Sequence, residues 1–230
     1  MSARAFAISD IHGCVKTFIA LVEQVIVLKK EDTLFLLGDY IDRGPDSKGV
    51  IDYIFQLKEA GFKLVTLRGN HEQMLLEGLV DEAGFNRFNV NGGDKSLLSF
   101  GVSKVNEMDK KYLDFFNTLQ YFSTYENFVL VHAGLNFEVP DPLQDKFSML
   151  WIRKFKVPTS HKDKIVVHGH VPTALTDIES SIESVHQDHQ IGIDNGCFYG
   201  SNEFYGHLCC LELNSLQLFV QANIDMKPLY

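Results

Sequence analysis

The sequence predicts an α/β protein in which two stacked, mixed β-sheets are flanked by helices. Three observations support this fold class. Apolar runs alternate with segments of helical spacing over residues 3–80, and residues 191–221 resemble antiparallel strands. Polar residues also follow five of the apolar runs, as is typical where parallel strands end at a binding site. Because 230 residues can bury one sizeable core, a single domain over residues 1–230 is the simplest expectation.

The first part of the chain repeats a strand, a turn and a helix three times. The helices are predicted from apolar residues that recur at helical spacing, such as Phe18 and Val22. Repetition of this kind predicts parallel strands with helices covering them. The predicted strands are residues 3–9, 33–37 and 62–67, and the predicted helices are residues 15–22, 50–57 and 72–80.

The middle of the chain, about residues 81–124, has a different character. Asn91-Gly92-Gly93 interrupts any regular pattern, and residues 109–119 look helical. We therefore expect a helical insertion that covers one edge of the sheet. The remaining strands are predicted at residues 128–131, 165–167, 191–193, 207–213 and 216–221.

Composition narrows the class of protein. The net charge is -9 and no basic block stands out, which argues against a nucleic-acid partner because such partners bind mainly through phosphate neutralisation. No apolar stretch approaches the roughly 20 residues of a membrane helix, and the first apolar run is too short for a signal peptide. Four cysteines at irregular spacing fit neither a disulfide framework nor a zinc ribbon. We expect a cytoplasmic protein with reduced thiols and no membrane partner.

Each of five predicted strands is followed by side chains that can bind a metal ion or transfer a proton. Because the carboxyl ends of parallel strands lie along one edge, these five loops should converge. Carboxylate, amide and imidazole groups bind manganese, iron or zinc, and a carboxylate can bridge two cations roughly 3.5–4 Å apart. One such pattern alone is common in turns and helix caps, but five together favour a site. The residues are Asp10, His12, Asp39, Asp42, Arg43, Asn70, His71, His132 and His170.

The motifs that contain these residues resemble those of a known family. Asp-Ile-His-Gly, Gly-Asp-Tyr-Ile-Asp-Arg-Gly and Gly-Asn-His-Glu, followed by His-Ala-Gly and Gly-His, are similar to the motifs of the metal-dependent phosphoprotein phosphatases. That family belongs to the calcineurin-like metallophosphoesterases, which have a β-sandwich flanked by helices. The resemblance covers about residues 10–200. In its length and in its Asp-Arg-Gly-Pro motif, the chain looks most like the small bacterial and phage serine/threonine phosphatases.

The resemblance implies a role for each matched residue. His71 would be the general acid, oriented by Asp42, and Arg43 would bind the phosphoryl oxygens. Arg153 is expected to be the second phosphate-binding arginine. Two divalent metal ions are implied, with Mn²⁺ expected and iron or zinc as alternatives. Their implied ligands are Asp10 and His12 for the first ion, Asp39 for both, and Asn70, His132 and His170 for the second.

These assignments predict a metal-dependent phosphomonoesterase. The favoured activity is that of a protein serine/threonine phosphatase, with phosphotyrosine as a further substrate and a phosphoprotein or phosphopeptide as the partner. Hydroxide held between the two metals would attack phosphorus directly, while His71 protonates the departing alkoxide. The alternative enzyme is a dinucleoside polyphosphate hydrolase of the diadenosine tetraphosphate type. Asp42 favours the phosphatase, because those hydrolases typically lack an aspartate at this position. A non-catalytic module is disfavoured because every matched position is filled.

Overall fold

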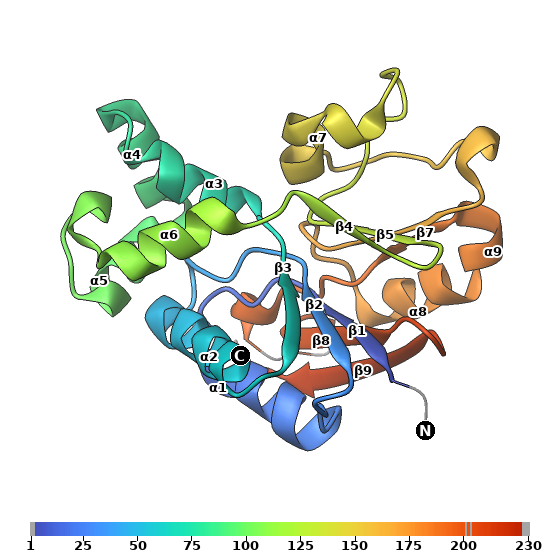
Figure 1. The fold of residues 1–230 in the computed structure, drawn as a ribbon, viewed down its shortest axis with the longest axis horizontal. Helices are drawn as coiled ribbons and strands as arrows, with labels where there is room; N and C mark the ends of the chain where they lie inside the picture. Colours follow the sequence, from blue (N-terminus) through green and yellow to red (C-terminus); the bar gives the residue numbers. More distant parts are fainter. Residues whose placement is uncertain (1–2, 201, 203, 227–230) are drawn as a thin grey trace.

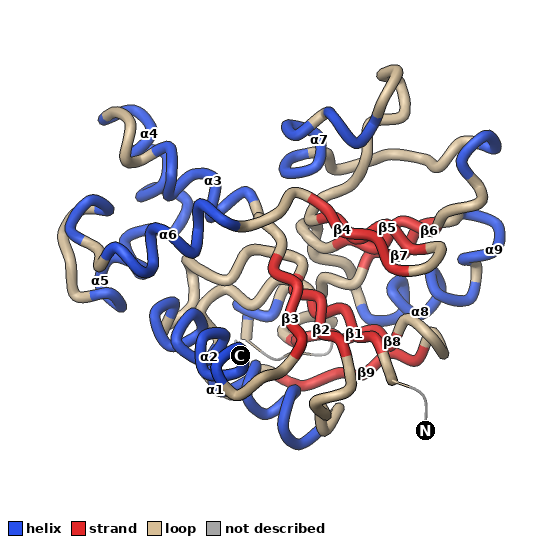
Figure 2. The backbone as a smooth tube through the Cα atoms, in the orientation of Figure 1, coloured by secondary structure: helices blue, strands red, loops and turns tan. Residues whose placement is uncertain are grey.

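The computed structural model describes residues 3–200, 202 and 204–226, and it confirms the predicted fold class. Two β-sheets stack on one another, with helices around them (Figures 1 and 2). Within the described residues one sheet has five strands, in the order β3-β2-β1-β8-β9, and the other has four, in the order β4-β5-β6-β7. The strands are β1 (Ala5–Ile8), β2 (Thr33–Leu36), β3 (Lys63–Thr66), β4 (Phe122–Tyr125), β5 (Phe128–Val131), β6 (Ile165–His168), β7 (Gln190–Gly192), β8 (His207–Glu212) and β9 (Gln217–Ala222).

Strand direction determines where the predicted site residues can meet. β1, β2 and β3 run parallel to one another, and so do β5, β6 and β7. β8, β9 and β4 pair antiparallel with their neighbours, so both sheets are mixed. The sequence predicted convergence at the edge of one sheet, whereas the five strands that precede the motifs belong to two different sheets. The motifs therefore meet only because the two sheets are stacked with these strand ends on the same side of the molecule.

Alternate residues of the central strands point to opposite faces, as the pleat of a strand requires. Phe6 and Ile8 of β1 join the core on the helix side, whereas Ala5 and Ala7 join the core between the sheets. β2 and β5 contribute to the same inter-sheet core with alternate residues. Each central strand is therefore buried on both faces, which explains why its sequence reads as a continuous apolar run.

The helices fall into groups that are visible in Figure 1. α1 and α2 lie against the outer face of the five-stranded sheet, α3 to α6 gather at one end of the molecule, and α7 lies near the four-stranded sheet. None of the described helices is long and apolar enough to span a membrane. The α-helices are α1 (Val15–Ala20), α2 (Ser47–Glu59), α3 (Asn70–Glu77), α4 (Glu82–Phe88), α5 (Asp94–Phe100), α6 (Lys110–Thr118), α7 (Lys146–Trp151), α8 (Leu175–Glu183) and α9 (Val185–Asp188).

The predicted insertion, residues 81–124, contains α4, α5 and α6. A short π-helical turn, η2 (Asn89–Gly93), joins α4 to α5 at the Asn-Gly-Gly breaker. Gly92 has φ +103°, a conformation that glycine adopts without steric cost. The last residues of the predicted insertion differ from the expectation, because β4 begins at Phe122 and pairs with β5. The single-domain assignment stays a prediction.

Candidate metal centre and active site

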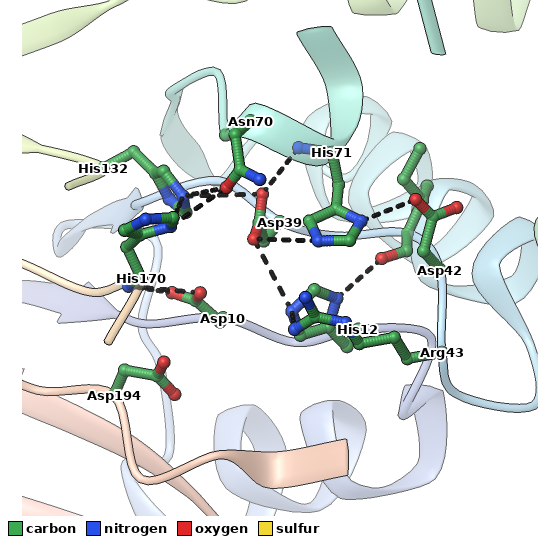
Figure 3. Close-up of polar contacts among 12 residues, drawn as sticks. Asp10, His12, Asp39, Asp42, Arg43, Asn70, His71, His132, His170 and Asp194 are labelled. Atoms are coloured by element: carbon green, nitrogen blue, oxygen red, sulfur yellow. Dashed lines mark hydrogen bonds and ion pairs between the residues drawn. The ribbon is translucent and has the colours of Figure 1, made fainter. Parts of the chain in front are cut away.

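Loops that are far apart in the sequence meet at one end of the stacked sheets (Figure 3). The main-chain N–H of His170, after β6, donates to both carboxylate oxygens of Asp10, after β1, at 3.1 and 3.2 Å. His132 Nε2, after β5, lies 2.9 Å from Asn70 Oδ1, at the start of α3. The structure thus brings the predicted metal ligands into one buried cluster. Each is at most 9% exposed: Asp10, His12, Asp39, Asn70, His132 and His170.

Asp39 lies at the centre of this cluster, with its two carboxylate oxygens facing different groups of histidines (Figure 3). Oδ2 lies 3.5 Å from His12 Nε2 and 3.9 Å from His71 Nε2. Oδ1 lies 3.5 Å from His132 Nε2. Two three-residue sets have ligand atoms within 4.8 Å of one another, and Asp39 belongs to both. One set is completed by His12 and His71, and the other by His132 and His170. This is the arrangement that a bridging carboxylate requires.

Main-chain carbonyls orient two of these imidazoles toward the cluster. The carbonyl of Ile41 lies 2.8 Å from His12 Nδ1, and the carbonyl of Leu37 lies 3.1 Å from His132 Nδ1. Because a carbonyl can only accept, each Nδ1 carries the proton and each Nε2 keeps its lone pair. Metal-binding histidines are typically fixed in this way by a partner on the other ring nitrogen.

Asp10, a predicted ligand of the first metal ion, lies outside the two close sets of potential ligand atoms. Its carboxylate faces the main-chain N–H of His170. Burial raises the pKa of Asp10 well above its ordinary value, and the nearby carboxylates of Asp194 and Asp39 raise it further. Asp194 lies in Asp-Asn-Gly-Cys, which resembles a late loop of the family, and was not predicted to be a site residue, although it is buried beside Asp10 (Figure 3). The role of Asp10 as a ligand stays a prediction.

The residues present fit a pair of divalent cations. Burial alone would raise the pKa of Asp39, but the surrounding histidines lower it below its ordinary value. Burial, together with the neighbouring His132, lowers the pKa of His170 to about 3, so this imidazole is a neutral donor. His170 Nδ1 lies 3.0 Å from Asn70 Oδ1 and 3.2 Å from His132 Nε2, so three potential ligand atoms meet in the buried cluster. Such polar atoms are costly to bury unless something binds them. A carboxylate, an amide and neutral imidazoles form a donor set suited to manganese, iron or zinc.

His71 and Asp42 form a second unit beside the cluster. Asp42 Oδ2 lies 2.6 Å from His71 Nδ1, and both side chains are buried. Burial would lower the pKa of His71, but the negative charges of Asp39 and Asp42 outweigh this effect and raise it. The Nε2 atom of His71 points toward Asp39, so a proton on it would face the centre. This arrangement suits proton donation, although the same nitrogen also lies within reach of the first metal set.

Both predicted arginines line the pocket over the cluster. This pocket has a volume of about 350 Å³, and Asp39, Asn70 and His170 line it together with Arg43 and Arg153. Arg43 Nη1 lies 2.9 Å from His12 Nε2, and its guanidinium carbon lies 4.5 Å from the ring centroid of Phe198. Two guanidinium groups at one pocket provide planar donor sites that match phosphoryl oxygens.

Two supporting residues were missed at the sequence level. Glu72 was predicted only to begin a helix after the Gly-Asn-His-Glu motif, but its buried carboxylate accepts hydrogen bonds from the N–H groups of Asp39, Tyr40 and Gly69, at 2.9, 2.8 and 2.9 Å. It therefore holds the loop that carries the bridging carboxylate. The other is Ser96, whose hydroxyl lies 2.6 Å from Asp42 Oδ1. No feature of its sequence neighbourhood distinguishes Ser96 from an ordinary helix serine.

Comparison with known proteins agrees with this geometry. The profile of the calcineurin-like phosphoesterases matches residues 3–209. The chain belongs to this family. The family match and the two buried histidine and aspartate sets together make it a metal-dependent phosphoesterase, and therefore a hydrolase.

Proteins similar to this chain in sequence or in fold have different named activities. A symmetrical bis(5'-nucleosyl)-tetraphosphatase of Buchnera aphidicola is 39% identical over 71 residues, which cover 31% of this chain and 25% of that protein. A putative diadenosine tetraphosphatase has a TM-score of 0.61 at 20% identity, covering 96% of this chain and 93% of that one. A Saccharomyces cerevisiae serine/threonine phosphatase has a TM-score of 0.65 at 15% identity, covering 99% and 83%. The chain spans less than half the length of the curated relatives it matches.

Proposed function

We propose that this metallophosphoesterase hydrolyses dinucleoside polyphosphates. The observation that carries the proposal is a second pocket of about 490 Å³, which adjoins the pocket over the metal ligands. The two pockets share Arg153, Pro172 and Tyr199, and the second is also lined by Tyr205. A polyphosphate bound at the first pocket can thus extend past Arg153 into a space with aromatic walls. Stacking on an aromatic ring stabilises a bound nucleobase by about 1–3 kcal/mol.

The comparisons support the same substrate class. The curated relatives reported above are named tetraphosphatases, and a solved structure named for this activity covers nearly the whole chain. They favour the dinucleoside polyphosphate alternative over the protein phosphatase that the sequence motifs predicted.

Each of the chain's residues at the site would have a separate role in the reaction. Arg43 and Arg153 would bind the equatorial oxygens of the phosphoryl group that is cleaved. His71 would donate the proton on Nε2 to the departing oxygen, and Asp42 would hold the imidazole by its Nδ1–H. The two divalent cations, when bound by the ligand set described above, supply charge neutralisation and activate water.

The second candidate activity is protein serine/threonine phosphatase, and the His71–Asp42 pair favours it. The two atoms of this pair are 2.6 Å apart, in a buried site. An alkoxide is a much poorer leaving group than a nucleoside phosphate, so a well-oriented acid matters most for phosphoserine and phosphothreonine. The metal ligands themselves do not discriminate between the two substrate classes.

A side-by-side assay with manganese tests the proposal. Diadenosine tetraphosphate should be hydrolysed with a kcat/KM at least tenfold above that of a phosphothreonine peptide. Tyr199→Ala should lower the kcat/KM for the dinucleotide about tenfold, because one stacking surface is removed, and Tyr199→Phe should restore it. If kcat/KM is higher for the phosphopeptide and Tyr199→Ala has no effect on the dinucleotide, the proposal is wrong and the chain is better assigned as a protein phosphatase.

A further inference from the structure

Residues 89–100 of the insertion, which comprise η2 and α5, lie directly against the loop that carries Asp42 and Arg43. The sequence pattern predicts no chemical role for this segment, only a break in the helical spacing at Asn91-Gly92-Gly93. Asp42 and Arg43 have φ values of +72° and +66°, which non-glycine residues rarely adopt. Such a conformation costs free energy and persists only where the surroundings hold it. The segment supplies part of these surroundings, together with Ser47, whose hydroxyl accepts from the Asp42 main-chain N–H at 3.0 Å and lies 2.9 Å from the Ser96 hydroxyl.

Ser96 makes the most specific of these contacts. Its side chain is completely buried. Its hydroxyl donates to Asp42 Oδ1 at 2.6 Å and accepts from the Asp42 main-chain N–H at 2.9 Å. Since His71 Nδ1 lies 2.6 Å from the other oxygen, Oδ2, each carboxylate oxygen has its own partner. Ser96 therefore fixes the rotation of the carboxylate, and with it the direction of the His71 ring.

Gly92 brings the same segment against Arg43. The carbonyl of Gly92 accepts from the Arg43 main-chain N–H at 3.4 Å. A Cβ atom on Gly92 would lie 2.9 Å from that nitrogen and 3.0 Å from Arg43 Cγ. Only glycine allows this approach, so the position of the segment relative to Arg43 is closely determined.

We propose that Ser96 is a positioning residue for proton donation by His71, acting through Asp42. This inference rests on the proposed role of His71 as the general acid, but it does not depend on which phosphate compound is the natural substrate. The alternative is that Ser96 only stabilises the fold. The two roles differ in their dependence on the leaving group, because a poor leaving group needs the proton and a good one does not.

The test uses the full chain with manganese and two monoesters, para-nitrophenyl phosphate and a primary alkyl phosphate. Ser96→Ala should lower kcat for the alkyl phosphate about tenfold more than kcat for para-nitrophenyl phosphate, as expected for the loss of one hydrogen bond to a charged group. Ser99→Ala is the matched control. Ser99 lies on the same helix, accepts from Lys48 N–H and donates to Asp46, each at 2.9 Å, and makes no hydrogen bond to Asp42 in the part of the chain that the structure describes. It should leave the ratio between the two substrates unchanged.

Two further measurements separate positioning from stability. In the His71→Asn background, Ser96→Ala should cause no additional loss on the alkyl phosphate, because both changes remove the same proton transfer. The downfield NMR resonance of the His71 Nδ1 proton, identified by its absence in His71→Asn, should shift in Ser96→Ala but not in Ser99→Ala. This second readout needs no turnover. If Ser96→Ala does not fold, Ser96→Cys keeps the shape with a weaker donor and should give the same changes in smaller size.

The outcomes distinguish this inference from the assignment of His71. Equal loss on both esters in His71→Asn would overturn the general acid and the inference together. A strong leaving-group effect in His71→Asn, with equal losses on both esters and an unshifted resonance in Ser96→Ala, would overturn only the inference. Preference for a phosphopeptide over a dinucleotide would change the substrate but leave the role of Ser96 standing.

Discussion

Two regions of this molecule contribute to one site in different ways. The loops after β1, β2, β3, β5 and β6 carry the groups that can bind metals and phosphate, and those groups are recognisable from residue type and spacing. Residues 89–100 contribute a serine hydroxyl and a glycine carbonyl, which are ordinary in any helical segment. The loops supply the reactive groups, whereas residues 89–100 help to orient two of them, Asp42 and Arg43.

Backbone conformation shows why the second region is needed. The site loops contain five non-glycine residues with positive φ, whereas α5 is regular. Local conformations of this kind are unfavourable by themselves and must be stabilised by contacts from elsewhere. A search for motifs finds the strained residues but not the residues that hold them in place. The five are His12, Asp39, Asp42, Arg43 and His170.

The largest expected effect tests the chemistry of the loops. His71→Asn should lower turnover by roughly two to four orders of magnitude, the range for loss of general acid catalysis. Metal content, measured by elemental analysis, should stay at the wild-type level. Loss of metal together with activity would instead make His71 a ligand, as its proximity to His12 and Asp39 allows.

The next effect compares the two arginines at the pocket. Arg43→Ala should lower kcat/KM by roughly 100-fold and Arg153→Ala by roughly tenfold, since a hydrogen bond to a charged group contributes about 1.5–3 kcal/mol. Arg43 should matter more because it is packed against His12 and Phe198, whereas Arg153 is exposed. Arg43→Lys should restore only part of the loss, because an ammonium group cannot bind two oxygens in a plane. Equal effects of both alanine variants would contradict this ranking.

A stability measurement tests how closely residues 89–100 must approach the loop that carries Arg43. Gly92→Ala should destabilise the protein by about 3 kcal/mol, because φ is +103° and the new Cβ would meet the Arg43 main chain. Gly101→Ala is the control, since Gly101 also has positive φ, +69°, but no atom lies within 4 Å of its added Cβ. It should cost only about 1 kcal/mol. Urea unfolding of the metal-free protein measures both, and equal costs would mean that the close approach at Gly92 is unimportant.

The smallest expected effect lies away from the site, where an ion pair only supports the fold. Asp32 accepts hydrogen bonds from Arg4 Nη2 at 2.6 Å and from the main-chain N–H groups of Arg4 and Lys29, each at 3.0 Å. Burial would raise the pKa of Asp32, but these hydrogen bonds outweigh burial and lower it. A lowered folded-state pKa gives stability that is present above about pH 4 and is lost as pH falls through the folded value.

Asp32→Asn should therefore cost about 1 kcal/mol at pH 7 and much less at pH 3. Asp114→Asn serves as the control, because the Lys110–Asp114 pair is largely exposed. Its cost should be no more than about 0.5 kcal/mol at pH 7. A cost for Asp32→Asn that is the same at pH 3 and pH 7 would show that the charge of Asp32 does not contribute.

The fold was predictable where local pattern and burial agree. β5 lies at the predicted residues, and β1 and β2 lie within one or two residues of the predicted ends, because strands buried on both faces have continuous apolar sequences. β3, an edge strand that is only partly buried, also lies within one residue of the predicted ends. β4 was missed, because its Phe-Ser-Thr-Tyr sequence is half-buried and its strand state depends on pairing with β5. The division of the strands between two sheets depends on long-range contacts that no local pattern encodes.

The candidate site, like the fold, could be predicted from the sequence only in part. Asp39, Asn70, His132 and His170 were identified because their side chains carry the chemistry themselves. The contribution of Ser96 depends on a contact across 54 residues of chain, and nothing near it in the sequence indicates this contact.

Asp39 is expected to bridge two cations. A crystal structure of the protein with Mn²⁺, with the ions located by anomalous scattering, tests it most directly. We predict two ions roughly 3.5–4 Å apart, both bound by Asp39, with one on the side of His12 and the other on the side of His132 and His170. A single ion, or two ions that do not share Asp39, would contradict the account.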